Sequence, residues 1–448
     1  MGILETLRNA WKIADLRKKI IYTLFIILLF RVGSSIPVPF INAEALEVYF
    51  SSQGSLLGYL NMLSGNALTE GTIFALTIQP YINASIIIQL LTIAIPALER
   101  LSKDGGEEGR KKINQITRYV TVGIALIQAF GYLVTLKSTA NGVAALTPVA
   151  GFPGFLQQLA IVLVLVAGSC LVMWLGESIN EKGIGNGISM LLFAGILSSI
   201  PSGALVLWER FYTMGIASLE QNQGQALWMM ISTVLVLVLF LAMIGFIVFM
   251  TDAERRIPIQ YAKKVVGRKM YGGQNTHMPI KVNMSGVMPI ILAVSILSLP
   301  SILVTFLGEP APGGFWAAIV GMFQQDSWVY IILYALMIIG FAFFYVTIQY
   351  NPTEMANNLR KNGGAIPGQR PGKPTADFIK RVLNKVTFIG ALFLGVVALF
   401  PSVFGKVSNF AGLTIGGTSL MIVVGVALET VQQIESQMMM RHYKGFLD

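Results

Sequence analysis

Residues 226–250, ALWMMISTVLVLVLFLAMIGFIVFM, run for twenty-five positions without one charged side chain. A helix needs about 20 apolar residues to cross the hydrocarbon core of a membrane, so this stretch predicts a transmembrane span. Nine further stretches meet the same criterion. Together they give ten predicted spans at 20–36, 73–98, 117–136, 155–176, 184–207, 226–250, 285–307, 327–350, 386–403 and 414–434.

The composition excludes a soluble protein of this length. Of the 448 residues, 12% are charged and 54% are apolar, and the mean hydropathy is +0.68, whereas soluble domains carry about 25% charged residues. The single cysteine, Cys170, excludes a disulfide framework or a Cys-rich metal site. Only two histidines, His277 and His442, are available as metal ligands. We therefore expect an all-α, multi-pass membrane protein with no metal and no cofactor.

The basic residues orient the chain in the membrane. Of the 32 lysines and arginines, 28 fall on the side of the two termini, three fall on the other side, and Arg31 lies inside the first span. The positive-inside rule then places both termini in the cytoplasm. Residues 1–19 place Ile3, Leu7, Trp11 and Ala14 at helical spacing among charged residues, which predicts an amphipathic helix on the membrane surface.

The ten spans divide into two sets of five, and an odd number per half makes the second half run inverted relative to the first. This division permits, but does not require, inverted halves over 20–207 and 208–436, followed by a cytoplasmic tail over 437–448. Inverted halves are typical of transport proteins, and the sequence shows no clear identity between its halves.

Three stretches are unusual for lipid-facing helices. Residues 54–72, GSLLGYLNMLSGNALTEGT, are apolar but broken by glycines, which fits either a re-entrant helix inside the protein or an ordinary surface helix. In the second span, Pro80 removes a helix hydrogen bond, and polar Gln79, Asn83 and Gln89 should face the protein interior. The glycines of 183–187 favour close helix packing.

Two long cytoplasmic segments, 251–281 and 351–385, are strongly basic. The first alternates apolar and polar residues around 257–261 and has a Gly-Gly break at 272–273, which predicts a protruding hairpin. The second contains GGAIPGQRPGKPT, which is too rich in glycine and proline for a helix. Their length exceeds what a connection needs, so we expect them to dock an acidic protein surface or RNA.

The sequence offers no catalytic motif and no nucleotide-binding loop. Only Arg31, Arg118 and Glu429 lie inside the predicted spans, and no span offers a partnered carboxylate at mid-depth, as an ion-coupled transporter usually requires. A passive channel with docking loops is the leading hypothesis, a small-solute secondary transporter is the alternative, and an intramembrane enzyme is disfavoured.

Six ordered motifs resemble the SecY family, the channel subunits of the bacterial Sec protein translocase. The motifs cover essentially the whole chain: YLNMLSGNAL, FALTIQPYINASIIIQLL, GESINEKGIGNGISMLLFAGI, ERRIPIQYAKK, KVNMSGVMPIIL and GGTSLMIVV. The resemblance implies two inverted five-helix halves around an hourglass pore in the cytoplasmic membrane. Unfolded secretory polypeptides would cross through this pore, and helices of membrane proteins would leave it sideways into lipid.

The resemblance also implies a set of site residues. An aliphatic ring closing the pore would consist of Ile78, Ile82, Ile188, Leu192, Ile291 and Ile422. A plug over 57–72 would include Leu60, Met62, Leu63, Gly65 and Asn66. A lateral gate between spans 2–3 and 7–8 would carry Gln89, Gln128 and Ser295. Docking residues would be Arg255, Arg256, Lys263, Lys264, Arg268, Arg360, Arg370 and Lys373.

The family likeness implies partners as well. They are the small membrane subunits SecE and SecG, the SecA motor ATPase, the ribosome, signal sequences, unfolded preproteins and the anionic lipid membrane. The chain itself would not be an enzyme, because the motor or the ribosome would supply the energy. The sequence departs from the family's common pattern at Thr77, where glycine is frequent, and at Gln79, where methionine is. Thr77 is the stiffer residue at the junction between plug and helix.

Overall fold

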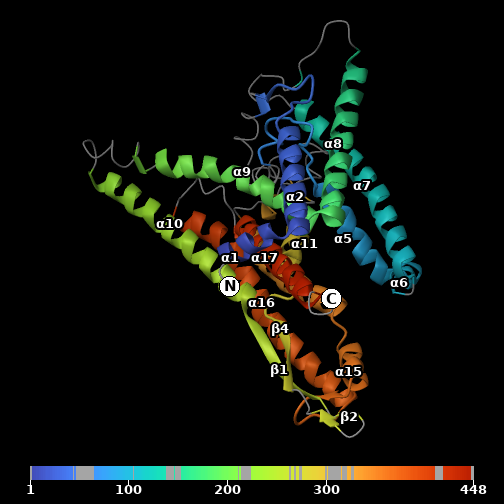
Figure 1. The fold of residues 1–448 in the computed structure, drawn as a ribbon. Coiled ribbons are helices and arrows are strands. Elements are labelled where there is room, and N and C mark those ends of the chain that lie inside the picture. The colour runs from blue at the N-terminus through green and yellow to red at the C-terminus, as the bar shows by residue number, and fades with distance from the viewer. Residues whose placement is uncertain are drawn as a thin grey trace. The chain divides into compact units, whose positions relative to one another are not determined.

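The computed structural model divides the chain into two compact units (Figure 1). Unit 1 comprises Met1–Thr233, Ser298–Ser327 and Phe410–Asp448, and unit 2 comprises Val234–Leu297 and Trp328–Asn409. The residues that the structure describes are 3–43, 45–46, 65–103, 105–137, 146, 153–209, 211–212, 223–261, 264–266, 269–271, 275–297, 300, 314, 320–323, 327–408 and 417–444.

Each of the ten predicted spans overlaps an α-helix in the described part of the chain. The helices are α2 (Ala14–Gly33), α5 (Gln79–Ala94), α7 (Gly106–Lys137), α8 (Gly154–Lys182), α9 (Gly187–Glu209), α10 (Gln223–Asp252), α11 (Met288–Leu297), α14 (Trp328–Gln349), α16 (Lys373–Ser408) and α17 (Gly417–Lys444). Among the described residues, six helices are long and apolar enough to cross a membrane, and a bent pair could add a seventh. The multi-pass helical architecture is thereby confirmed.

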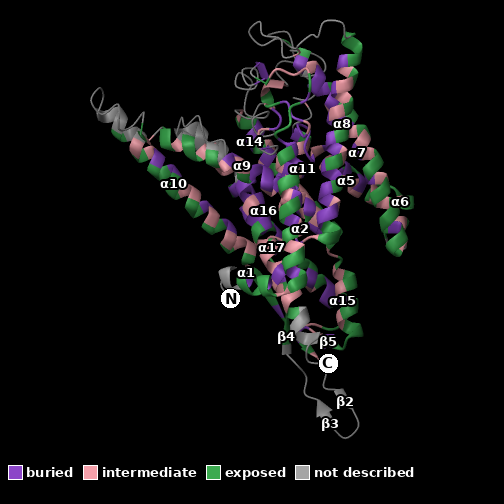
Figure 2. Ribbon diagram, turned by 45° about the horizontal axis from the view of Figure 1, so that its top comes forward, coloured by how far each residue is buried: buried purple, intermediate pink, exposed green. Residues whose placement is uncertain are grey.

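Helix α8 illustrates how the sequence forms these elements. Ile161, Leu165, Val172 and Ile179 are buried, and their spacing of about one or two helical turns puts them on one stripe. Trp174 on the opposite face is 59% exposed, and other large apolar side chains of the long helices are exposed as well. Figure 2 shows exposed positions, in green, along the length of α8. A helix that is apolar on its exposed face as well as its buried one is suited to a lipid surrounding.

The N-terminal segment forms two helices, so the single helix over 1–19 is corrected. Helix α1 (Ile3–Lys12) ends at Ile13, whose backbone is extended, and α2 begins at Ala14. Ala10 is fully buried in a cluster with Leu16, Ile184 and Ile434. The apolar side of α1 therefore packs on protein, next to α17, while Trp11 remains half-exposed.

The second span is one continuous helix only over Gln79–Ala94 and bends after it, which corrects the predicted 73–98. Pro80 stands in the first turn of α5, where its missing N–H costs no helix hydrogen bond. The helix ends before extended Ile95, and α6 (Pro96–Lys103) leaves it at 106°. Both ends follow from proline, since Pro80 favours a helix start and the residue before Pro96 avoids the helical region.

In unit 2, the described strands within 254–281 pair as the predicted hairpin requires. Strand β1 (Glu254–Tyr261) pairs antiparallel with β4 (Asn275–Lys281), and Ile257 lies opposite Met278. A second antiparallel pair, β2 (Lys264–Val266) and β3 (Lys269–Tyr271), stands between them in sequence. The Gly-Gly break at 272–273 lies outside the described residues.

The basic segment 351–385 is largely helical, which differs from the expected long loop. Asn351 caps helix α15 (Pro352–Lys361), because its side chain accepts hydrogen bonds from the N–H groups of Thr353 and Glu354. Residues 362–372 form no helix, as their glycines and prolines predict. They include the short strand β5 (Gly364–Ala365). Helix α16 then begins at Lys373, thirteen residues before the predicted span.

Strand β5 joins the two basic segments. It pairs antiparallel with β1, on the edge opposite β4, and gives the sheet order β4–β1–β5. One apolar cluster lies beneath this sheet and both helices: Ile257, Ile280, Ala356, Ile366, Ala376, Ile379, Leu383 and Val386. The two segments therefore form one folded body, which we call the basic platform, residues 254–281 and 351–385.

Candidate functional site

Residues 65–78 form a chain of turns inside unit 1, which we call the re-entrant segment. Ala67 is fully buried, and Phe74 and Ile78 are nearly so. Backbone hydrogen bonds tie the segment to the chain after α2, since the Val38 N–H donates to Gly71 O and the Ile73 N–H donates to Ile36 O. For the described residues, the surface-helix alternative is wrong.

Only part of the predicted plug can be placed. Gly65 and Asn66 belong to the re-entrant segment, and both have positive φ angles, of 66° and 71°. Leu60, Met62 and Leu63 lie outside the described residues. The described part consists of turns, so the helical element expected from the sequence does not extend over it.

Gly65 rests against two polar side chains of neighbouring helices. A Cβ added at Gly65 would lie 2.6 Å from Arg31 Nη1 and 2.6 Å from Ser198 Oγ. The Arg31 guanidinium on α2 donates a 2.9 Å hydrogen bond to the Ser198 hydroxyl on α9. The charged residue of the first span thus turns into the protein beside the re-entrant segment, and the position requires glycine for both space and φ.

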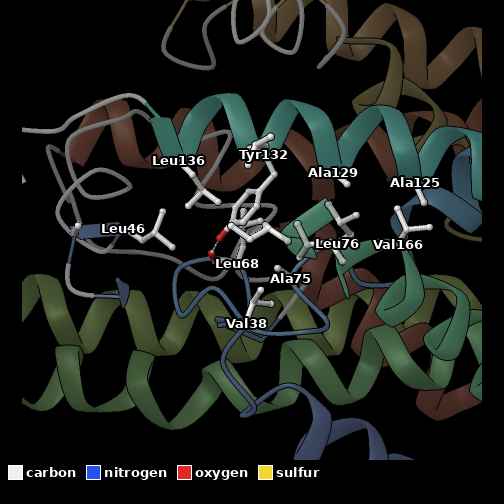
Figure 3. Close-up of a cluster of buried hydrophobic side chains, with 14 residues drawn as sticks. Val38, Leu46, Leu68, Ala75, Leu76, Ala125, Ala129, Tyr132, Leu136 and Val166 are labelled. Carbon is white, nitrogen blue, oxygen red and sulfur yellow. Dashed lines mark hydrogen bonds between the residues drawn. The ribbon is translucent and has the colours of Figure 1, made fainter. Parts of the chain in front are cut away.

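Two aromatic contacts fix the segment on opposite sides. The ring of Phe74 stacks on Phe30 of α2, with centroids 5.8 Å apart. The buried hydroxyl of Tyr132 on α7 donates a 2.8 Å hydrogen bond to the carbonyl of Leu68 (Figure 3). On α8, a Cβ at Gly168 would lie 2.1 Å from Ile73 O, so helix and segment approach backbone to backbone.

Thr77 closes the segment in a strained conformation. Its φ is +51°, a region in which β-branched residues are outliers because Cβ crowds the backbone. Thr77 O accepts a 3.4 Å hydrogen bond from the Ser169 hydroxyl of α8, and helix α5 begins two residues later. Thr77 thus stands where the family frequently has glycine, and glycine adopts such a positive φ freely.

We expect glycine to be more stable than alanine at position 77. Both substitutions remove the same side-chain groups beyond Cβ, and only alanine retains the crowding at positive φ. At an ordinary helical position alanine is the more stable residue; here Thr77→Gly should exceed Thr77→Ala by about 1 kcal/mol. Thermal unfolding of the two purified variants in detergent checks the order, and a more stable alanine variant would contradict the strain.

The six predicted ring residues lie in both units. Ile78, Ile82, Ile188, Leu192 and Ile422 belong to unit 1, and Ile291 belongs to unit 2. Ile78, Leu192 and Ile422 are buried, whereas Ile82, Ile188 and Ile291 are half-buried. Of the elements of unit 1 that carry them, α9 contacts α17, whereas α5 and α9 each contact α8, which carries no ring residue. The convergence of all six on one constriction stays a prediction.

The glycine turn between α8 and α9 ties several helices together. A Cβ at Gly187 would lie 1.9 Å from Gly176 O, so the predicted close packing is confirmed. The N–H of Gly185 donates to Gln433 on α17 (2.7 Å), and that of Ile184 donates to Thr23 on α2 (2.9 Å). The turn holds the start of α9, which carries Ile188 and Leu192, against α17.

Arg118 has an acidic partner that the predicted span boundaries missed. Its guanidinium forms a 2.8 Å ion pair with Glu177, because α8 continues to Lys182 rather than ending at 176. Arg118 stands at the start of the predicted span 117–136 and Glu177 just beyond the predicted span 155–176, so the pair does not bear on the expectation that no span offers a partnered carboxylate at mid-depth, which stays a prediction. The Arg118 side chain is half-exposed, which suits a pair between the outer surfaces of α7 and α8 better than a buried substrate site.

The predicted gate residues are partly accessible in each unit. Gln89 on α5 and Gln128 on α7 are half-buried in unit 1, and Ser295 on α11 is half-buried in unit 2. Helices α5 and α7 pack side by side, as the predicted pairing of spans 2 and 3 requires. Whether the three residues face one interface stays a prediction.

The docking residues that the structure describes project from the basic platform. Arg255, Arg256, Arg360, Arg370 and Lys373 are exposed, and Arg256 pairs with Glu254 at 2.6 Å. Lys264 stands on β2, and the structure describes no more of it than its backbone. Lys263 and Arg268 lie outside the described residues.

Arg370 lies in a turn of the platform whose backbone accepts a side-chain hydrogen bond. It lies in the turn between Gly368 and Gly372, whose φ angles are +80° and +106°. The hydroxyl of buried Thr375 donates a 2.7 Å hydrogen bond to Arg370 O. The backbone is thus held while the guanidinium points into solvent, an arrangement suited to binding a partner's carboxylate or phosphate.

Sequence reasoning missed two contacts of the site, Tyr132 to Leu68 and Arg31 to Ser198. Arg31 did carry a usable signal, because a charge inside an apolar span predicts a polar partner in the protein interior. Tyr132 carried a weaker one, since a buried tyrosine hydroxyl usually finds an acceptor. Neither signal identifies the partner, which lies 64 residues away for Tyr132 and 167 for Arg31.

Comparison with known proteins gives a consistent result. A sequence model of the SecY family matches residues 72–431. The protein translocase subunit SecY of Streptomyces coelicolor is 43% identical over 455 residues, which cover 99% of this chain and 100% of that protein.

Solved structures share the fold. One is a SecY protein whose plug domain stabilises the closed state of the translocation channel and maintains a membrane seal; it is 19% identical, has a TM-score of 0.64, and the match covers 94% of this chain and 92% of that one. Another is Sec61 in the canine ribosome–channel complex from the endoplasmic reticulum, at 19% identity and a TM-score of 0.58, with the same coverage of both chains.

Proposed function

The chain belongs to the SecY family of protein translocase subunits, and on that premise we propose how its residues form a protein-conducting channel. Unfolded secretory polypeptides cross the cytoplasmic membrane through it, and helices of membrane proteins leave it sideways into lipid. The observation that carries the proposal is the re-entrant segment: an irregular stretch buried among apolar helices is tolerated only within protein or beside a water-filled path.

In this proposal the re-entrant segment is the plug, and the aliphatic residues 78, 82, 188, 192, 291 and 422 form the seal. The burial of the segment against α2, α7, α8 and α9 supports the first assignment. Aliphatic side chains support the second, since they exclude water and ions by dewetting but form no specific bonds to a passing chain. The five-plus-five division into inverted halves is part of the same proposal.

We further propose that the basic platform is the cytoplasmic docking site for the SecA motor and the ribosome. The common core under its two segments and its exposed arginines support this role. Both termini then lie in the cytoplasm, and the basic loops also face anionic lipid. SecE and SecG are the proposed membrane subunits of the complex. The chain supplies no energy itself, so its partners drive transport.

The lateral gate is proposed between spans 2–3 and spans 7–8. The segments 78–93, 120–132 and 287–300 contain no charged residue, which suits an interface that must part repeatedly, because separating a buried ion pair costs about 3–5 kcal/mol. Polar Gln89, Gln128 and Ser295 supply weaker bonds, since interhelical hydrogen bonds in membranes average about 0.6 kcal/mol.

Cross-linking tests this function. One cysteine on α5 and one on α11, in a Cys170→Ser background, should form a disulfide in the idle channel, and oxidation should then block export until a reductant is added. Each single-cysteine variant under the same oxidation is the matched control. Normal export of secretory proteins by fully cross-linked channel would refute the gate.

A further inference from the structure

Helix α7 presents one buried stripe to the re-entrant segment. Ala125, Ala129, Tyr132 and Leu136 recur at helical spacing and are all buried. In Figure 3 they line one side of the apolar cluster, and the tyrosine ring reaches across it to Leu68. Tyr132 is the one member of this stripe that carries a polar group.

The hydroxyl of Tyr132 makes a directed contact in this apolar setting. It donates a 2.8 Å hydrogen bond to Leu68 O, whereas the N–H of Gly71 reaches the same carbonyl at only 3.4 Å. The hydrogen bond from the Tyr132 hydroxyl is therefore the shorter of the two that Leu68 O accepts. A hydrogen bond inside an apolar cluster is strengthened by the low local polarity.

We propose that Tyr132 is a positioning residue that holds the re-entrant segment closed on helix α7 and releases it when that helix moves. Gln128, a proposed gate residue, lies one helical turn before Tyr132 on the same side of α7. A displacement of α7 at the gate therefore also shifts the donor of the bond to Leu68. The inference rests on the proposed channel function and adds a physical link between its gate and its plug.

This link between the gate and the re-entrant segment predicts how strong a signal sequence must be to open the channel. A short hydrogen bond tolerates little displacement before its geometry fails, so gate movement removes the bond early. A signal sequence must then supply enough binding free energy to break this bond in addition to the gate contacts. Removing the hydroxyl should let weaker signal sequences open the channel.

The first test measures the closed segment directly. Tyr132→Phe keeps the ring and removes only the hydroxyl, and Tyr119→Phe is the matched control, because Tyr119 lies on the same helix and is 69% exposed. In the purified channel, amide hydrogen exchange over residues 65–78 should accelerate about fivefold in Tyr132→Phe. It should be unchanged in Tyr119→Phe, and helix α14 should exchange as in the wild type in both variants.

The second test measures the proposed consequence. In proteoliposomes, Tyr132→Phe should export a precursor with a weakened signal sequence several-fold better than the wild type and a precursor with a strong signal equally well. Unchanged exchange over 65–78 would overturn the positioning role whether or not the chain is a channel. Faster exchange with unchanged signal stringency would overturn the link to the gate. Failure of the wild type to export any precursor would instead refute the proposed function.

Discussion

We expect Arg370→Glu to abolish motor-driven translocation and to leave the folded bundle intact. Arg370 is exposed on a turn whose backbone is fixed by Gly368, Gly372 and the Thr375 hydroxyl. The backbone of the turn therefore has little freedom to lose on binding, and the guanidinium is accessible to a partner from solvent. Reversal of the charge places a carboxylate opposite an acidic group of the partner, and like-charge juxtaposition at an interface costs several kcal/mol. That cost corresponds to a loss of at least about a hundredfold in affinity.

Precursor export by proteoliposomes with the SecA motor measures this effect. Arg381→Glu is the matched control, since Arg381 is an exposed arginine of the same platform on α16 but outside the turn. It should retain most of the activity, and both variants should unfold at the wild-type temperature. Export at the wild-type rate by Arg370→Glu would refute the docking role of the turn.

We expect the replacement of Ile82 and Ile188 together with serine to open the resting channel to ions. Both side chains are half-buried, so the double variant should fold with less penalty than one made at Leu192 or Ile422. An apolar constriction excludes ions because it dewets, and each aliphatic side chain contributes about 1.5–3 kcal/mol of transfer free energy. Since each 1.4 kcal/mol is about tenfold in rate, the ion leak should rise by at least about tenfold.

Conductance of the purified channel in planar bilayers measures the leak. The matched control is Ile87→Ser with Leu197→Ser, which makes the same changes on the same two helices at exposed positions. It should conduct no more than the wild type. Equal leak in the two double variants would show that Ile82 and Ile188 are not part of the seal.

The sequence predicted the helical architecture because apolar runs of span length have few alternatives in a membrane protein. The predicted helix boundaries were wrong where local backbone geometry and packing decide where a helix begins. Pro80 predicts the loss of a hydrogen bond within a helix, but in the structure it stands in the first turn of α5. Helix α16 begins early because Ala376, Ile379, Leu383 and Val386 form an apolar stripe. The helical spacing of that stripe is present in the sequence, but the glycines and prolines of the preceding GGAIPGQRPGKPT suggested a loop.

The site was less predictable for a different reason. The hairpin could be predicted from alternation, but the pairing of β5 with β1, which joins the two basic segments, depends on tertiary packing. The position of Gly65 next to Arg31 and Ser198 likewise depends on three segments far apart in the chain. Periodicity reports which face of an element is buried; it does not report which partner covers that face.

Photocross-linking of a precursor arrested in transit tests the central claim most directly. A photoreactive residue is placed in turn at Ile82, Ile188 and Ile291, and at exposed Ile87 and Leu197 as controls. The precursor carries a folded domain at its C-terminus that halts it within the channel. The proposed channel predicts adducts to the polypeptide at all three ring positions and at neither control. Adducts at Ile87 and Leu197 with none at the ring would show that the polypeptide does not pass through this constriction.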